Sequence, residues 1–443
     1  MSLRNLFRFA TVCTLVVPSL QAITSAQETR PSGTALQFIN ADRGMTLAQL
    51  VAVALDKSPA VLAARAQVDA SRGERAQARL RPNPSLMSDL REEVGGTDRQ
   101  TMVGLSVPLD LFRRPGRTEL ADRNIEVAEG NLHDVERRLA GEVRSKVIQL
   151  SAAVRHLEVR EQVAQTLTQF RDLVAARAAS GASPPLERDM ADIDARRAAA
   201  EVLRQRAAAE ATLSELKALL GFKPSEVLLV RERLEDLARL SEPPGGRVAD
   251  DAVGERADVK LAEAQIRAAT AELGLIRLNV KPDVMLNTSY MRMRSGFPLL
   301  GLSGSGAPSP IEGVFHNISI GATLMLPLRD RGQGNIATGT ARITAAKQSA
   351  DAVRLSAHAE VAAASSRVER LDQALAIYSG GLLDLASKNV EVMRGSYQLG
   401  RATLLEVLNE TRRFLETETA YTDLLLEAMQ ARSDLATAMG VIR

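Results

Sequence analysis

The chain contains the same pattern of residues twice, at two fixed spacings. Matching positions in the two copies include Gln67 and Gln265, Pro84 and Pro282, Gly181 and Gly400, and Gly221 and Gly440. The first two pairs lie 198 residues apart and the last two lie 219 residues apart. The second copy therefore carries 21 extra residues, which fall between its two strand-like runs. An internal duplication of this size predicts a fold built from two equivalent units.

The N-terminus has the pattern of a secretory signal. Two arginines precede an apolar run, and Thr24-Ser25-Ala26 resembles a cleavage site, so residues 1–26 are predicted to be removed on export. The alternative, a transmembrane anchor, needs a longer apolar run. Cys13 is the only cysteine and lies inside this segment. The predicted mature chain therefore has no N-terminal lipid, no disulfide and no thiolate metal site.

Charge and hydropathy argue against a nucleic-acid-binding protein and against an inner-membrane protein. The chain has 56 basic and 54 acidic residues, and removal of the signal takes away two arginines, so the mature chain is predicted to be neutral. Binding to nucleic acid needs a concentrated basic face, and no nucleic-acid partner is expected. No later segment has the uninterrupted apolar length of an inner-membrane helix. The protein is expected outside both the cytoplasm and the inner membrane.

Each unit opens with a predicted helix. The first runs over residues 45–80, with Thr46 as N-cap and a break at Pro59, and the second runs over residues 257–278. Prolines end both helices.

Two short alternating segments follow in each unit. Residues 102–107, 284–291 and 317–326 alternate apolar with polar side chains, and residues 85–91 do so less cleanly. A period of two predicts strands whose two faces meet different media. The alternative is a half-buried hairpin of a soluble domain.

A very long helix comes next in each unit, at about residues 116–180 and 335–399. Apolar residues of the first helix step by three and four, as in coiled-coil packing. About 65 residues at about 1.5 Å each give a length on the order of 100 Å, too long for a compact core. Both helices end at a glycine turn, after which a second helix returns to Gly221 or Gly440.

Four strands cannot close a membrane barrel, which needs about eight or more. If the strands enter a membrane, other copies of the chain must complete the barrel, and three copies would supply twelve strands. The predicted fold class is mainly α with a small β part: an internally duplicated coiled-coil barrel of long helices plus four strands per chain.

These residues resemble the TolC-like outer-membrane efflux family. The resemblance covers about residues 45–443 and rests on three features: the run Arg81-Pro82-Asn83-Pro84-Ser85-Leu86, the strand end Val107-Pro108-Leu109-Asp110-Leu111-Phe112 with its arginine-rich turn, and the two helix-tip turns. It implies a homotrimer in outer-membrane lipid, with a periplasmic helical barrel. It also implies a periplasmic adaptor and an inner-membrane pump as partners. The strand end is most similar to the subgroup that serves resistance-nodulation-division pumps for heavy-metal cations.

The predicted organisation has five parts. They are a signal peptide at 1–26, an N-terminal extended segment at 27–44, repeat 1 at 45–221, a connecting segment at 222–256, and repeat 2 at 257–443 with a longer strand–strand loop.

The predicted function is the outer-membrane channel of a tripartite efflux system, an exit duct for small solutes and in particular heavy-metal cations. Two alternatives keep the same architecture, a type I protein-secretion duct and a multidrug duct. A periplasmic coiled-coil scaffold is an alternative of another class. No enzyme and no cofactor are expected, because the four histidines lack metal-ligand spacing and no catalytic triad pattern is present.

The helix-tip turns are the predicted functional site. In the family they lie at the periplasmic mouth, where the adaptor docks and the pore closes. The residues assigned to this site are Gly181, Ser183, Leu186, Glu187, Gly400, Thr403, Leu405 and Glu406. The alternative interpretation, compatible with the first, is an ordinary helix C-cap followed by an N-cap.

Two further sets of residues suggest contact with cations. Asp189 and Asp192 are three apart on a predicted helix, and three copies would form an acidic ring; the alternative, which is the commoner case, is a solvated helix face. Five methionines fall on the polar parity of the strands: Met87, Met102, Met285, Met291 and Met325. Thioethers suit Cu(I) or Ag(I), and the alternative is space filling by a flexible side chain.

Overall fold

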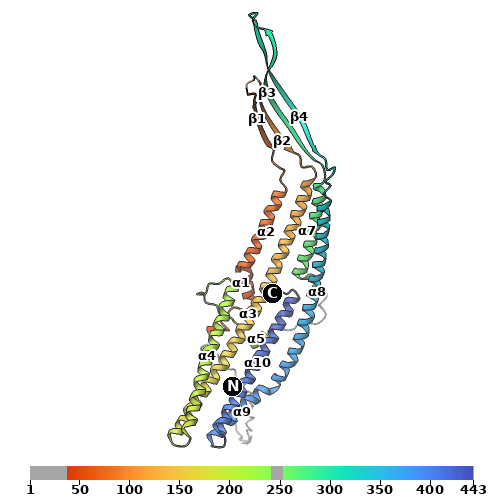
Figure 1. Ribbon diagram of the computed structural model, residues 1–443. Coiled ribbons are helices and arrows are strands. Elements are labelled where there is room, and N and C mark those ends of the chain that lie inside the picture. Colours follow the sequence, from red (N-terminus) through yellow and green to blue (C-terminus); the bar gives the residue numbers. More distant parts are fainter. Residues whose placement is uncertain (1–36, 95, 97, 241–252, 443) are drawn as a thin grey trace, which may run out of the picture.

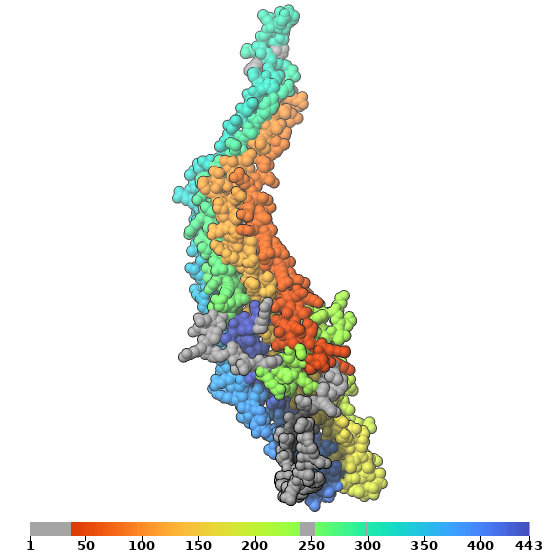
Figure 2. All heavy atoms as spheres, turned by 180° about the vertical axis from the view of Figure 1, so that it is seen from behind, coloured from red at the N-terminus to blue at the C-terminus, as the bar shows by residue number. Residues whose placement is uncertain are grey.

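The computed structural model describes residues 37–94, 96, 98–240 and 253–442. The predicted signal peptide and the first ten residues of the 27–44 segment lie outside this part of the chain. The molecule is long and narrow, with a sheet at one end and two helical hairpin turns at the other (Figures 1 and 2). It is mainly α-helical with a small β part, as the sequence predicts.

The two units have the same order of elements. The first consists of α1 (Leu47–Lys57), α2 (Pro59–Ala78), β1 (Ser85–Glu92), β2 (Arg99–Pro108), α3 (Arg113–Ala179) and α4 (Pro185–Leu219). After α5 (Leu234–Leu240), the second consists of α7 (Ala257–Asn279), β3 (Asp283–Leu302), β4 (Pro308–Met325), α8 (Gln333–Ile377), a π-helical turn (Tyr378–Leu382), α9 (Leu383–Gln398) and α10 (Leu404–Ala438).

Local sequence explains where the first helices start and stop. Thr46 and Gln49 form a reciprocal capping box at the start of α1. Pro59 starts α2 as its first residue, since it has no N–H to lose there. Both features confirm the predicted N-cap and the predicted break.

The four strands form one antiparallel sheet in the order β1-β2-β3-β4. The register pairs Met87 with Gly104, Gly104 with Ser289, and Ser289 with Ser319, so these residues share one face of the sheet. The other face is apolar in its part nearer the helices, and exposed examples there are Leu86, Leu105, Leu286, Ile318 and Ile320. Toward the outer hairpin the same face carries Arg292, Arg294, Glu312 and His316. The alternation therefore produces two chemically different faces, as predicted.

The inserted residues of the second unit do not form the longer loop expected from the sequence. Most of them extend the strands, so β3 has 20 residues and β4 has 18, against 8 and 10 in β1 and β2. Figure 1 shows the outer parts of β3 and β4 continuing as a hairpin beyond β1 and β2. Antiparallel pairing satisfies the backbone groups that a long loop would leave unpaired.

The two long helices differ in continuity. Helix α3 is unbroken over 67 residues. The helix expected at 335–399 is interrupted, and the prediction of one continuous helix is wrong there. Gly381 has φ of 107°, a conformation that only glycine adopts readily, and it separates α8 from α9.

The apolar seam of α3 supplies the main core. Val143, Val147, Leu150 and Leu157 are fully buried at steps of three, four and seven residues, in agreement with the predicted coiled-coil pattern. They pack in one cluster with residues of α1, α4, α5 and α10. In the connecting segment, Val230 forms short β-bridges with Ile39 and Met45 and so ties the start of repeat 1 to this core.

No single helix among the described residues has the length and apolar character needed to cross a membrane. The pair α1 and α2, bent by 45°, meets that test only when the two are taken together.

Close approach of helices depends on glycine. A Cβ added at Gly130 of α3 would lie 3.2 Å from Cα of Leu261 on α7, so the two backbones are nearly in contact there. A Cβ added at Gly274 of α7 would have no heavy atom of a neighbouring residue within 4 Å.

We expect Gly130→Leu to lower the free energy of unfolding by about 1–3 kcal/mol, because the added side chain forces α3 and α7 apart. The matched control, Gly274→Leu, should leave stability unchanged or raise it, since leucine favours a helix more than glycine does. Thermal and denaturant unfolding of the purified protein would measure both. Equal effects of the two substitutions would contradict the close approach.

Candidate functional site

The end of the molecule away from the sheet consists of two helical hairpin turns, at the positions predicted for the site (Figure 1). Gly181 lies between α3 and α4 with φ of 75°, and Gly400 lies between α9 and α10 with φ of 70°. At each turn, the N–H one residue beyond the glycine donates to a carbonyl five residues earlier, at 2.8 Å. Both turns are therefore Schellman caps that require glycine.

The helices that leave the two turns start differently. In α10, the Thr403 hydroxyl accepts from the Glu406 N–H, and the Glu406 carboxylate accepts from the Thr403 N–H at 2.7 Å. These bonds lower the pKa of Glu406. In α4 the N-cap is Pro184, and Ser183 Oγ is buried without a hydrogen-bond partner. Ser183 therefore does not act as the cap.

Glu187 matches Glu406 in the duplication but has a different partner. Its carboxylate accepts a hydrogen bond of 3.3 Å from the Tyr397 hydroxyl of α9. Tyr397 is 4% exposed and makes an edge-to-face contact with Phe170 of α3, at 5.0 Å between ring centroids. Burial, together with the nearby Glu187 carboxylate, raises the pKa of Tyr397.

Arg177 of α3 completes this contact. Its Nη1 donates to the Tyr397 carbonyl at 3.1 Å, and its guanidinium lies 5.0 Å from the centre of the Tyr397 ring. We call Phe170, Arg177, Glu187 and Tyr397 the tip clamp, because they join the α3–α4 hairpin to the α9–α10 hairpin.

The tip clamp is not among the sites predicted from the sequence. A signal was present, because Tyr397 occupies the position that Ala178 has in the first copy, and an aromatic residue there breaks the duplication. The partners of Tyr397 lie more than two hundred residues away in sequence, and no local pattern reveals them.

Leu186 and Leu405 occupy equivalent first-turn positions and are exposed at the tip. A groove of about 290 Å³ lies further along the same helices, between α3, α4 and α10. Its lining combines apolar residues with charged ones, among them Arg197, Glu201 and Arg412. The tip thus offers apolar side chains beside a polar groove.

Two helices at this end carry exposed apolar residues that no part of the described chain covers. On α9, Leu385, Val392 and Leu399 are spaced by seven residues and are 58–71% exposed. On α4, Leu186 and Ile193 show the same spacing of seven. Apolar seams with a heptad period normally face another helix.

Asp189 and Asp192 lie on α4, as the sequence predicts. Each has an arginine partner on the same helix: Arg188 Nη2 is 2.8 Å from Asp189, and Arg196 Nε is 2.7 Å from Asp192. The acidic ring stays a prediction, and within one chain these charges are locally balanced.

The five methionines singled out in the sequence lie on one face of the sheet. Met102 pairs directly with Met291, and the pairings Pro108–Met285, Met87–Gly104 and Asp283–Met325 put the other three on that face. Among the described residues, no group of three or more His, Cys, Asp or Glu is arranged to hold a metal ion.

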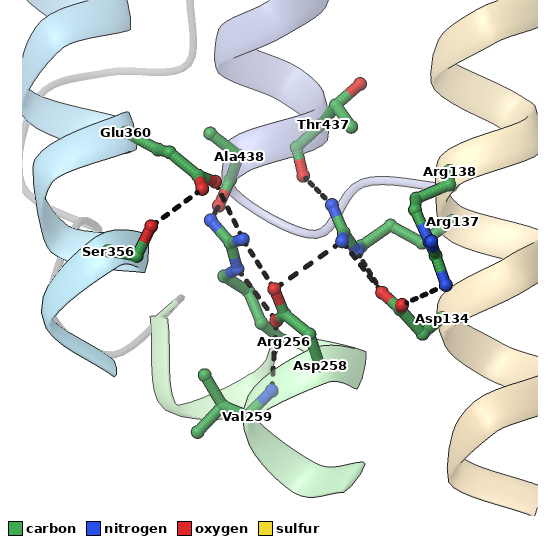
Figure 3. Close-up of polar contacts among 10 residues, drawn as sticks. All are labelled: Asp134, Arg137, Arg138, Arg256, Asp258, Val259, Ser356, Glu360, Thr437 and Ala438. Carbon is green, nitrogen blue, oxygen red and sulfur yellow. Dashed lines mark hydrogen bonds and ion pairs between the residues drawn. The ribbon is translucent and has the colours of Figure 1, made fainter. Parts of the chain in front are cut away.

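A buried ion network crosses the middle of the helical part (Figure 3). Arg256, 2% exposed, makes two hydrogen bonds to Asp258, at 2.7 and 3.0 Å, and a third to Glu360 of α8 at 2.8 Å. Arg137 of α3 joins Asp258 to Asp134. Burial alone would lower the pKa of Arg256, yet its two carboxylate partners raise it overall.

The same network caps the end of α10. Arg137, Arg144 and Arg256 donate to the carbonyls of Thr437, Val441 and Ala438 respectively. The last carbonyls of a helix lack partners within the helix and carry the negative end of its dipole. Arg137 and Arg256 therefore satisfy carbonyls at the end of α10, and Arg144 binds the segment just beyond it. Together the three arginines join α3, α7, α8 and α10.

Comparison with known proteins gives consistent matches over most of the chain. A family model described as outer membrane efflux protein matches residues 50–222 and 248–441. The cobalt-zinc-cadmium resistance protein CzcC of Cupriavidus metallidurans is 22% identical over 404 residues, covering 89% of this chain and 90% of that protein. The nickel-cobalt-cadmium resistance protein NccC of Alcaligenes xylosoxydans xylosoxydans is 26% identical over 333 residues, covering 73% and 70%. A crystal structure of CusC has a TM-score of 0.73 at 19% identity, covering 89% of this chain and 92% of that chain.

The buried network predicts a stability difference between two arginines. Arg256→Met should lower the free energy of unfolding by about 1–3 kcal/mol, because Asp258 and the Ala438 carbonyl lose a buried partner. Arg204, whose partner Glu201 is on the same exposed helix surface, is the matched control, and Arg204→Met should have no measurable effect. Urea unfolding would compare them, and equal midpoints would contradict the role given to Arg256.

Proposed function

The chain belongs to the outer membrane efflux protein family, and from this premise we propose that it is the exit duct of a tripartite system that exports heavy-metal cations. Like its relatives, it is an outer-membrane efflux channel with a periplasmic helical tunnel. The cation cargo, the trimer and the partner proteins of this chain are the proposed part.

One observation carries the cargo assignment. The likeness to CzcC, a protein named for cobalt, zinc and cadmium resistance, extends over nine-tenths of both chains. NccC, named for nickel, cobalt and cadmium resistance, supports the same class of cargo. Passage through a duct needs no catalytic group, and the proposal includes no enzymatic step.

Unpaired surfaces support assembly as a homotrimer. The sheet has two open edges, β1 and β4, and an apolar outer face, so it needs further strands to be stable in lipid. The exposed seams on α4 and α9 are separate surfaces of one chain (Figure 1). Packing of the α4 seam of one protomer on the α9 seam of the next would cover both in a closed ring.

The helix-tip turns are the proposed docking site for a periplasmic adaptor. Gly181 and Gly400 hold the turns in shape, and Thr403 with Glu406 fixes the start of α10. Leu186 and Leu405 are exposed in one chain, and Leu405 is the apolar contact that these turns still present when the α4 seam is covered by the next protomer. The groove between α4 and α10 continues this surface along the helices.

The tip clamp is the proposed lock on the periplasmic mouth. It adds polar contacts between two hairpins that also share an apolar cluster, in which Val174, Leu404 and Val407 take part. Breaking the clamp loosens the α9–α10 hairpin. The glycine break at Gly381 lies between this hairpin and the buried network on the same side of the molecule, and it is a natural position for bending.

The metal and drug sensitivity of a deletion strain tests which cargo the duct exports. Loss of the gene should sensitise cells to cobalt, zinc, cadmium or nickel salts, and a plasmid copy should restore growth. Tolerance to hydrophobic drugs and secretion of proteins should not change. Sensitivity to drugs alone would make the chain a multidrug duct. Extraction of the protein from membranes at high pH would support the scaffold alternative instead.

The lock predicts a change in conductance. Arg177→Ser combined with Tyr397→Phe removes hydrogen bonds worth about 1–3 kcal/mol, enough to shift a closed–open equilibrium about tenfold. Single channels in planar bilayers should therefore open far more often or conduct more. The control is Arg171→Ser on the same helix, because the partner of Arg171 within the described part of the chain is its neighbour Asp172. Unchanged conductance in the double variant would rule the lock out.

A further inference from the structure

Every methionine of the four strands lies on the same face of the sheet. To the five found from the sequence, the structure adds Met293, which pairs with Gln100 and Phe315 on that face. None lies on the apolar face, where a merely hydrophobic side chain would be expected. The methionine-bearing face otherwise carries mostly small or uncharged polar residues, together with Asp89, which lies opposite Met102, and Arg91, Asp283 and Phe315. In a membrane barrel such a largely polar face lines the pore.

Four of these methionines are neighbours in the register. Met102 and Met291 are directly opposed on β2 and β3, and Met293 follows two residues along β3. Met87 is the diagonal neighbour of Met102 on β1, since it pairs with Gly104. We call these four residues the thioether cluster.

Side-chain contacts show that members of the thioether cluster lie against residues of the neighbouring strand. A Cβ added at Gly104 would lie 3.8 Å from Cε of Met87, so this side chain extends over β2 at Gly104, two residues from Met102. The Gln100 amide contacts the sulfur of Met291. Directly opposed side chains have Cβ atoms about 5 Å apart, and methionine has three rotatable bonds, so several sulfurs can reach one ion.

The chemistry of the cluster selects one class of cation. Thioethers are neutral, soft ligands that suit Cu(I) and Ag(I), whereas Zn(II), Co(II) and Ni(II) prefer imidazole, thiolate or carboxylate. The described residues hold no His, Cys, Asp and Glu group that would serve those ions instead. Neutral ligands also bind weakly enough for release, which a conducting pore requires.

We propose that the thioether cluster is a binding site for soft monovalent cations, silver(I) and copper(I), on the pore wall of the β-barrel. The proposal rests on the heavy-metal function given above and extends it, because it adds soft monovalent cations to the divalent ions named there. A second pair, Met285 and Met325, lies nearer the helices as diagonal neighbours and extends the path.

Methyl NMR of the full-length protein tests the site directly. With methionine methyls labelled in a chloride-free buffer, silver nitrate should shift the four cluster methyls saturably, and zinc nitrate should not. Met102→Leu/Met291→Leu keeps side-chain volume and should weaken silver binding about tenfold or more. The matched control, Met190→Leu/Met393→Leu near the helix tip, should leave that binding unchanged.

Failure of the proposed silver site can be distinguished from failure of the proposed duct function. Silver shifts that are absent, or that are equal in the cluster and in the helical methionines, overturn the site. Tolerance of the same cells to zinc and cobalt is read separately: it should be normal in the Met102→Leu/Met291→Leu strain, since the duct itself is intact. Loss of divalent tolerance in that strain would contradict a role restricted to soft cations.

Discussion

Backbone hydrogen bonding at the two open edges of the sheet is the constraint on which the rest of this structure depends. Strands β1 and β4 are each paired on one side only. In hydrocarbon, every unpaired N–H or C=O costs several kcal/mol, so an open four-stranded sheet with an apolar face is not stable there. The fold of one chain is therefore a fraction of a barrel, and the helical part must place identical neighbours beside it.

The helical part meets that demand with one joint in its middle and another at its tip. In the middle, three arginines hold the end of α10 to α3, α7 and α8 (Figure 3). The first unit has no counterpart of Arg256 in this joint, because Ser58 occupies the matching position in the first copy. At the tip, the tip clamp joins the two hairpins, and Gly381 interrupts the helix between the two regions. Duplicated units thus acquired different mechanical roles.

Much of this fold was predictable because its determinants are local. Thr46, Pro59 and the glycines at 181 and 400 act within one turn of themselves, and strand alternation needs only neighbouring residues. The helix break at Gly381 was not predicted, although two consecutive glycines, Gly380 and Gly381, favour a break in a helix. The inserted residues were assigned to a loop because no clean alternation marks them. The contacts of Tyr397 and Arg256 could not be predicted from the sequence, because their partners are remote in sequence and a single sequence carries no covariation.

The most direct test of the central claim is a disulfide between the two sheet edges. In a Cys13→Ser background, Leu86→Cys on β1 would be combined in turn with Ile318→Cys, Ile320→Cys or Ala322→Cys on β4. Within one chain these strands are about 14 Å apart, beyond the reach of a disulfide, which needs Cα atoms within about 7 Å. Oxidation in membranes should give a covalent trimer on a denaturing gel for at least one pair. A chain that stays monomeric with every pair, although its cysteines react with a small thiol reagent, would contradict the shared barrel.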